Sequence, residues 1–266
     1  MLGLKWNIST DQIYTNPIDL NVGATTKREI LSSIAGQFDP FGYNTPLMMR
    51  ARLFLHTLQS DSSLGWDEPL SCNRIREWKN IAKQANRSPI LCINRCIGKK
   101  SDEYHLIGFS DSSAEAYGCV FYIWNQNNNQ ISFLLSRYRM VGRSLKGKSI
   151  PALELNAVEL AVETALDLRE ELSGSLNLEP LRLSNIALYS DSMVALQWLY
   201  NYHLKLDKMQ KCSVFVMNRL DKIALLTEKC PIQFFHTAGQ VNPADCLTKP
   251  YSHYLLKKTI FLGLNL

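Results

Sequence analysis

The sequence predicts an α/β fold in which a mixed sheet of five strands is flanked by helices, with a smaller and mainly helical region before it. Three observations lead to this prediction. Apolar residues recur at helical spacing over residues 26–85, runs of strand length alternate with helical segments from about residue 103, and a polar, basic stretch at 86–102 joins the two regions. A chain of 266 residues can hold one large or two modest domains, each with its own core.

Three helices are expected in the first region. Thr26 can cap the first helix, and Asp39-Pro40-Phe41-Gly42 breaks the helical pattern that follows it. The second helix is expected from Pro46, because proline is favoured in the first turn, where its missing N–H costs nothing. The third is expected to be capped near Ser71 and to carry Trp78 on its apolar face.

The second region begins with a three-stranded meander and continues with alternating helices and strands. The first strand of the meander is expected to end at Asp111, and the other two are expected to cover Tyr117–Trp124 and Ile131–Ser136. A helix from Pro151 to about Leu172 and a strand at 186–191 are expected next. After them we expect helices near 192–202 and 207–226, a strand at 232–236 and a short helix from Pro243. This order of elements predicts a mixed sheet covered by helices.

Four acidic residues stand where these elements begin or end. Asp111 and Asp191 each follow an apolar run of strand length, Glu154 lies one turn into a helix, and Asp245 follows the helix-start sequence Asn242-Pro243-Ala244. Carboxylates are the hard oxygen ligands that Mg²⁺ prefers, and a pair of such ions can activate water and stabilise the leaving oxygen of a phosphodiester. The pattern therefore predicts two-metal phosphodiester hydrolysis.

Glu154 gives this hypothesis its strongest support. A single Asp after a strand is more often a turn or helix cap than a ligand. Glu154, however, shares its helical face with small apolar residues, among them Ala157 and Ala161, and a carboxylate on such a stripe points into the protein. Burying it is costly without a cation or a hydrogen-bond partner. Glu159 and Glu163 fall off this stripe, and we expect them to be solvated.

Composition excludes several other classes of protein. Hydrophobic residues make up 46% and charged residues 20% of the chain, which are globular values and exclude wholesale disorder. No apolar run reaches the roughly 18 to 20 residues needed to cross a bilayer, and the N-terminus lacks the apolar block of a signal peptide. Seven scattered cysteines without a CxxC pair indicate free thiols. We therefore expect an intracellular, cytoplasmic protein.

Positive charge is concentrated in two places. The net charge of +5 lies within the first 100 residues, and the basic residues there are densest at 74–100. Phosphate backbones attract such surfaces through counterion release, so we expect a nucleic-acid partner, with a solvated surface as the alternative. A second, acid-free basic run lies between the third strand of the meander and the helix at Pro151. It consists of Arg137, Arg139, Arg143, Lys146 and Lys148.

These motifs together resemble the ribonuclease H domain of a retrotransposon polyprotein, most like the BEL/Pao class. The resemblance covers most of residues 103–250. The motifs, in chain order, are Gly108–Ser113 followed by Ala116-Tyr117-Gly118, Ile150–Leu155, Tyr189–Ser192 with Trp198 downstream, and Asn242–Asp245. The ending Asp245–Pro250 is also similar to the Copia-type terminus, which leaves the class open between BEL/Pao and Copia-like.

The resemblance extends upstream and implies how the chain is divided. Met1–Trp6, Thr26–Leu31 and Phe38–Gly42 resemble the segment that follows the polymerase active site in the same polyproteins. We therefore expect residues 1–100 to be the end of a reverse transcriptase (palm edge, then thumb or connection helices), residues 101–250 a ribonuclease H-like domain, and residues 251–266 a tail. No Tyr-x-Asp-Asp motif is present, so no polymerase activity is expected without the polymerase core as partner.

The resemblance also implies an activity and a set of site residues. Asp111, Glu154, Asp191 and Asp245 would bind two Mg²⁺ ions, with Mn²⁺ as a substitute, and cleave the RNA strand of an RNA–DNA hybrid. The 2′-hydroxyl and the geometry of the hybrid allow a protein to choose the RNA strand. Cellular enzymes of this type carry a histidine in the loop before the last acid. Here the nearby candidate is His236, which either assists product release or caps a sheet edge.

Two other functions are compatible with parts of the sequence. A catalytically silent nucleic-acid-binding or scaffold remnant of such a polyprotein would keep the fold, although the presence of all four acids argues against decay. An integrase-type enzyme uses a related sheet but ends its acidic set with a helical Glu, whereas Glu154 is second in chain order here. The sequence leaves the oligomeric state open.

Overall fold

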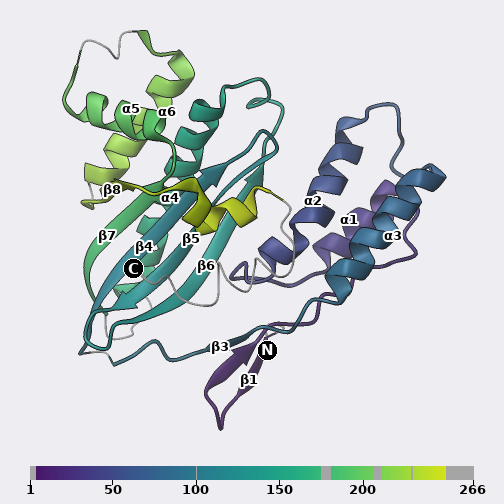
Figure 1. Cartoon of the computed structure of the whole chain (residues 1–266), viewed down its shortest axis with the longest axis horizontal. Helices are drawn as coiled ribbons and strands as arrows, with labels where there is room; N and C mark the ends of the chain where they lie inside the picture. Colours follow the sequence, from purple (N-terminus) through teal and green to yellow (C-terminus); the bar gives the residue numbers. More distant parts are fainter. Residues whose placement is uncertain (1–3, 100, 175–180, 207–210, 229, 250–266) are drawn as a thin grey trace. The chain divides into compact units, whose positions relative to one another are not determined.

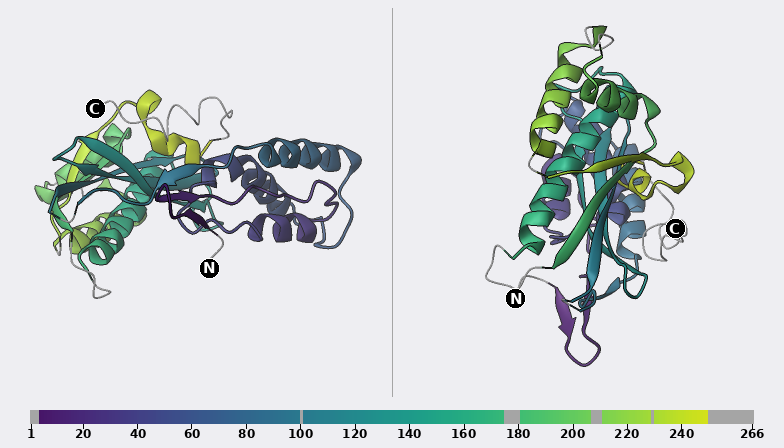
Figure 2. Two further views of the ribbon diagram at one scale, coloured as in Figure 1. Left: turned by 90° about the horizontal axis from the view of Figure 1, so that it is seen from below. Right: turned by 90° about the vertical axis from the view of Figure 1, so that its left-hand side faces the viewer.

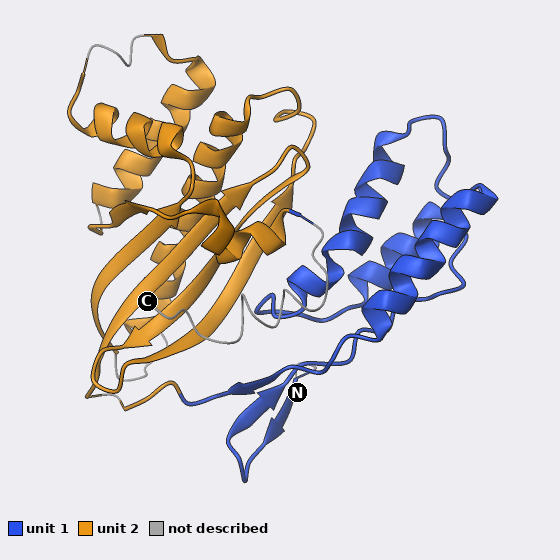
Figure 3. Cartoon of the chain, viewed as in Figure 1, with its two compact units in different colours: residues 1–96, 249–256 blue, residues 97–248, 257–266 orange. Residues whose placement is uncertain are grey.

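The computed structural model describes residues 4–99, 101–174, 181–206, 211–228 and 230–249 (Figure 1). The expected tail at 251–266, the first three residues of the N-terminal motif and the expected start of a helix at 207 lie outside the described residues. The chain divides into two compact units, which among the described residues are 4–96 with Lys249, and 97–248 (Figure 3). Of the helices that are described, none combines the length and hydropathy needed to cross a membrane.

The first unit contains three helices around its own core. They are α1 (Lys27–Ala35), α2 (Thr45–Ser60) and α3 (Cys72–Asn86). Thr26 and Glu29 form a reciprocal capping box at the start of α1, and the Ser71 hydroxyl accepts a hydrogen bond from the main chain of α3. Trp78 is fully buried in the core, where its ring stacks on that of Phe54. The mainly helical character expected for this region is confirmed.

A small antiparallel sheet in the first unit was not predicted. Its strands are β1 (Lys5–Asn7), β2 (Gln12–Tyr14) and β3 (Cys92–Asn94), in the order β1-β2-β3. The interpretation of residues 86–102 as a linker was therefore incomplete, because β3 lies inside that stretch. Strands of three residues are too short to show an alternating pattern in the sequence.

The second unit is built on a mixed five-stranded sheet. Its strands are β4 (Glu103–Ser112), β5 (Ala116–Asn125), β6 (Gln130–Met140), β7 (Arg182–Ser190) and β8 (Gln233–His236), and their order is β6-β5-β4-β7-β8. β4, β5 and β6 pair antiparallel, whereas β7 is parallel to both β4 and β8. The predicted architecture, a mixed five-stranded sheet with flanking helices, is confirmed.

Helices cover the sheet on one side, and a short segment contacts it on the other. The helices are α4 (Ile150–Leu172), α5 (Met193–His203) and α6 (Val214–Glu228), followed by the 3₁₀ turns η2 (Gly239–Val241) and η3 (Pro243–Leu247). α4 packs on β4, β5, β7 and α6 within one apolar core. η3 packs on β4 and β5 from the opposite side, as Figure 2 shows.

Burial of α4 on several sides corrects one expectation. Glu159 is buried and not solvated, because α6 packs against it and supplies two cations. Its carboxylate lies 2.8 Å from Nε of Arg219 and 2.7 Å from Nζ of Lys222. Lys222 also contacts Glu163, which is partly buried, at 2.5 Å. The sequence pattern of α4 alone does not reveal partners on another helix.

A row of aromatic rings crosses the whole sheet, with one ring from each strand. In strand order the rings are Phe133, Tyr122, Phe109, Tyr189 and Phe235, with successive centroids 5.6, 6.0, 5.0 and 5.2 Å apart. Offset and edge-to-face contacts at such distances are favourable beyond simple burial. Phe109 and Tyr189 lie two residues before Asp111 and Asp191, respectively, so the row helps to fix the spacing of β4 and β7 there.

Gly108 is required at the centre of the sheet. A Cβ at this position would lie 2.4 Å from Cδ2 of Leu188 and 2.5 Å from Cε1 of Phe121, and both of these side chains are buried. We expect Gly108→Ala to lower the free energy of unfolding by about 1–3 kcal/mol, because the core must shift to admit the methyl group. Urea unfolding of the purified variant measures this loss.

Gly142→Ala is the matched control, because nothing lies within 4 Å of a Cβ at that exposed position. Equal urea midpoints for the two variants would contradict the packing argument.

Candidate metal centre

The register of two parallel strands brings two carboxylates together. Ser110 of β4 pairs with Ser190, the last residue of β7, and the next residues along the chain are Asp111 and Asp191, respectively. The carboxyl ends of neighbouring parallel strands form one edge of a sheet, which is where ligands bind in open α/β folds. Asp111 is buried, with 1% of its surface exposed, whereas Asp191 is partly exposed.

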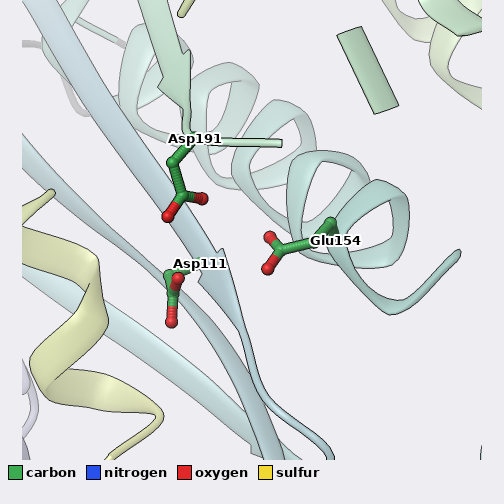
Figure 4. Close-up of side chains that lie close together, drawn as sticks. All are labelled: Asp111, Glu154 and Asp191. Atoms are coloured by element: carbon green, nitrogen blue, oxygen red, sulfur yellow. The ribbon is translucent and has the colours of Figure 1, made fainter. Parts of the chain in front are cut away.

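The third carboxylate comes from the covering helix. α4 begins after Ser149 with a proline in its first turn, and Glu154 faces inward with 6% of its surface exposed. One carboxylate oxygen from each of Asp111, Glu154 and Asp191 lies within 4.8 Å of the other two. Figure 4 shows the three side chains converging on one space.

This donor set fits a divalent cation. Three carboxylates this close repel one another, and two of them are removed from the water that would otherwise screen their charge. Their oxygen atoms are the hard ligands that Mg²⁺ and Mn²⁺ take in proteins. Within the described residues, this is the group of acidic, histidine and cysteine side chains close enough to hold an ion.

Asp245 lies beside this group and is not part of it. It occupies η3 and is buried, with 7% of its surface exposed. Burial, followed by the charges of Asp245 and Asp111, raises the pKa of the Cys246 thiol. The structure therefore brings three of the four predicted acids into one group, and the role of Asp245 as a ligand stays a prediction.

The segment that carries Asp245 is tied to the end of β4. The side-chain amide of Asn242 donates to the main-chain oxygen of Ser110 at 2.9 Å, and its carbonyl oxygen accepts from Ala244 N at 3.1 Å. The Thr248 hydroxyl donates to Oδ2 of Asp111, and both residues are buried. Sequence reasoning used Asn242 as a helix-start residue and did not identify Thr248, because neither contact follows from local spacing.

Comparison with known families decides what this site belongs to. Residues 26–192 match the profile of the Pao retrotransposon-like RNaseH-like domain, and this match spans more than half of the chain. The chain belongs to this family. The resemblance inferred from the motifs is thereby confirmed, and the sequence is that of a retrotransposon RNase H-like domain. No curated protein sequence matches it.

Solved structures with a similar chain course include viral and cellular proteins. The foamy viral protease-reverse transcriptase in complex with an RNA/DNA hybrid has a TM-score of 0.47 and 15% identity, over 81% of this chain and 25% of that chain. RNase H1 from the archaeon Halobacterium salinarum NRC-1 has a TM-score of 0.37 and 14% identity, over 55% of this chain and 93% of that one. The Pao-type chain thus spans about a quarter of the foamy viral chain.

A glycine lies directly against Asp191, the partly exposed acid of the Pao-type site. A Cβ on Gly239 would stand 2.8 Å from Oδ2 of Asp191. The close approach of the backbone at 237–240 to Asp191 was not predicted from the sequence. This approach joins segments that are distant in the sequence, which no local pattern indicates.

His236 ends β8 beside the site. It pairs in register with Ser190, the residue before Asp191, and it is exposed. Its imidazole makes no hydrogen bond or ion pair with another residue in the described ranges. This position is next to the carboxylates, and the assisting role of His236 stays a prediction.

The basic run divides into two groups. Arg137 and Arg139 on β6 face acids of α4, with Arg137 at 2.6 Å from Asp167 and Arg139 at 3.9 Å from Glu163. Arg143, Lys146 and Lys148 lie in the exposed loop between β6 and α4. The run is free of acids in the sequence, but its first two members meet acids in space.

An open cleft of about 500 Å³ lies at the start of α4. Its lining includes Lys148 and Ser149 just before α4, Trp198 of α5, and Lys211 and Ser213 just before α6. Lys148 also stands 5.0 Å above the Phe215 ring. Cations beside an aromatic side chain are the combination that nucleic-acid surfaces use for phosphates and bases.

We expect Gly239→Ala to weaken Mg²⁺ binding by about tenfold, because the new methyl group displaces the Asp191 carboxylate from its position. Calorimetric titration with Mg²⁺ measures the affinity, and Gly142→Ala again serves as the control, since a methyl group there meets nothing within 4 Å. Unchanged affinity in Gly239→Ala would show that the carboxylate is not constrained by this loop.

Proposed function

We propose that this domain hydrolyses the RNA strand of RNA–DNA hybrids with two Mg²⁺ ions, as part of a retrotransposon polyprotein. The observation that supports this proposal most directly is the convergence of Asp111, Glu154 and Asp191 within 4.8 Å. Family membership adds the context of an RNase H-like domain from a retrotransposon. Mn²⁺, which accepts the same oxygen ligands, is proposed as a substitute.

Each acid is proposed to have a defined place in the centre. Asp111, Glu154 and Asp191 would hold the ions, and Asp245 is proposed as the fourth ligand because its buried segment is tied to the end of β4. When bound, such ions activate a water molecule and stabilise the leaving oxygen of the phosphodiester. Asp111 and Glu154 form the enclosed side of the site, whereas the partial exposure of Asp191 leaves an open side for a substrate.

The loop between β6 and α4 is proposed to contact the nucleic-acid backbone. Arg143, Lys146 and Lys148 are exposed there, and the same loop leads into the helix that carries Glu154. Arg137 and Arg139 are proposed to contribute more weakly, because acids of α4 already offset their charge. Selection of the RNA strand would depend on its 2′-hydroxyl groups.

The remaining parts of the chain are proposed to connect this domain to a polymerase. Residues 1–100 are proposed to be the end of a reverse transcriptase, so the rest of that enzyme would be the partner that positions the hybrid.

The seven cysteines all lie in the described part of the chain, and no disulfide joins them. This supports an intracellular, reducing place of action.

We expect Asp191→Asn to abolish cleavage while hybrid binding and folding persist, since the change removes a metal-binding charge with almost no change in shape. Loss of several kcal/mol of transition-state stabilisation corresponds to at least about a hundredfold lower rate. The assay is cleavage of an end-labelled RNA–DNA hybrid with Mg²⁺, Mn²⁺ or EDTA, beside matched double-stranded RNA and DNA.

Asp221→Asn is the control, because this exposed aspartate of α6 accepts a hydrogen bond from Tyr202 and is not part of the three-carboxylate group. Cleavage by Asp191→Asn at the wild-type rate would refute the site assignment. Binding of the hybrid without any cleavage by folded wild-type protein would instead support a silent, nucleic-acid-binding remnant.

The basic loop is tested through salt dependence. We expect Arg143→Gln with Lys146→Gln to weaken hybrid binding at low salt and to reduce the slope of log K against log salt by about two, one for each lost phosphate contact. The control is Arg169→Gln with Arg182→Gln, which removes the same amount of positive charge from the last turn of α4 and the first residue of β7. An equal slope in the two double variants would show that the loop is a solvated surface without specific phosphate contacts.

A further inference from the structure

Thr248, the residue that follows η3, contacts Asp111, the most buried acid of the site. Thr248 is 2% exposed and Asp111 is 1% exposed, and the hydroxyl of Thr248 donates to Oδ2 of Asp111. We propose that Thr248 is a positioning residue of the metal centre, which fixes the orientation of the Asp111 carboxylate for the ion. This inference rests on the proposed function, because it assumes that Asp111 is a metal ligand.

The hydroxyl has one proton and two acceptors within reach. The other acceptor is the main-chain oxygen of Asp245, at 3.2 Å. The carboxylate is charged, and charge-assisted hydrogen bonds are about twice as strong as neutral ones, so the proton is directed to Asp111. The Asp245 oxygen already accepts the main-chain N–H of Thr248, also at 3.2 Å.

Thr248 is itself held from two directions. Its main-chain oxygen accepts the hydroxyl of Ser113 at 3.1 Å, and Ser113 lies just beyond the end of β4. Upstream, Asn242 donates to the oxygen of Ser110 at 2.9 Å. The segment at 242–248 is therefore tied to the chain on both sides of Asp111, and the position of the Thr248 hydroxyl follows from these anchors.

A glycine on the neighbouring strand allows this close approach. Gly118 of β5 pairs in register with Asp111, and a Cβ there would stand 3.2 Å from Cβ of Leu247 and 2.7 Å from the main-chain oxygen of Arg137. Leu247 is fully buried, and its side chain packs over Gly118, which has no side chain of its own. Thr248 is the next residue. A larger residue at 118 would lift the segment and withdraw the hydroxyl from Asp111.

The hydroxyl matters because a carboxylate can rotate about its own bond to Cβ. One oxygen held by Thr248 fixes the plane of the group, and the position of its other oxygen follows. Partners of this kind behind a metal ligand change metal affinity or activity by about 10- to 100-fold when they are removed. Thr248 is buried behind Asp111 and is proposed to act on the ion through this carboxylate, not as a ligand.

The test measures binding of Mg²⁺ alone to the complete 266-residue chain, by isothermal titration calorimetry without nucleic acid. Two substitutions that remove the hydroxyl are compared with their nearest hydroxyl-bearing forms: Thr248→Val with the wild type, and Thr248→Ala with Thr248→Ser. Each pair differs in the hydroxyl and little else, so the second pair decides the matter if Thr248→Val does not fold. Thermal unfolding in EDTA establishes that each variant is folded.

We expect the Mg²⁺ dissociation constant to rise about tenfold from the wild type to Thr248→Val and from Thr248→Ser to Thr248→Ala. Thr248→Ser should stay within about twofold of the wild type. Thr227→Val is the control, because the Thr227 hydroxyl donates to main-chain oxygens of α6 at 3.0 Å and contacts no acid of the site. In the cleavage assay, the Mg²⁺ midpoint should shift by the same factor, with the rate largely restored at saturating Mg²⁺.

The outcomes separate this inference from the function on which it rests. If the wild type binds Mg²⁺ and cuts the hybrid, while both hydroxyl-free variants bind Mg²⁺ as tightly as their partners, the positioning role is refuted and the proposed function stands. If the folded wild type binds no Mg²⁺ and cuts no hybrid, the two proposals fall together.

Discussion

The parallel pairing of β4 with β7 is the constraint on which the candidate site depends. Its register sets Ser110 opposite Ser190, so the two aspartates that follow must emerge side by side. A shift of one residue would turn one of these carboxylates to the other side of the sheet. Gly108 between Leu188 and Phe121, and the aromatic row across all five strands, restrict the packing to this register.

The site is assembled from both sides of the sheet. α4 brings Glu154 from the face that holds the main core, and the segment ending at Thr248 approaches β4 and β5 from the other face. Two of the three carboxylates are thereby shielded from water, while Asp191 lies beside the exposed loop of Gly239. Enclosure strengthens the attraction of these carboxylates for a cation, and the open side of the group lies at Asp191.

Much of this arrangement could be predicted from the sequence, and the missing parts share a physical cause. Asp111 and Asp191 were recognised because apolar runs precede them, and Glu154 because its helical face is small and apolar. The strands of the small sheet are too short for such patterns, and Glu159 was misjudged because its cations lie on α6. Thr248 and Asp111 are 137 positions apart, so their contact depends on tertiary packing alone.

Folding of the domain includes an electrostatic cost at the pairing of β4 with β7. β4, β5 and β6 are joined by short turns, whereas the whole of α4 separates β7 from them, and non-local pairings of this kind form more slowly than local ones. The like charges of Asp111 and Asp191 are therefore brought together when the parallel pair closes. A divalent cation that binds the folded carboxylates and not the unfolded chain would favour this closure. The ion proposed for the chemistry would then also act as a folding ligand of the domain.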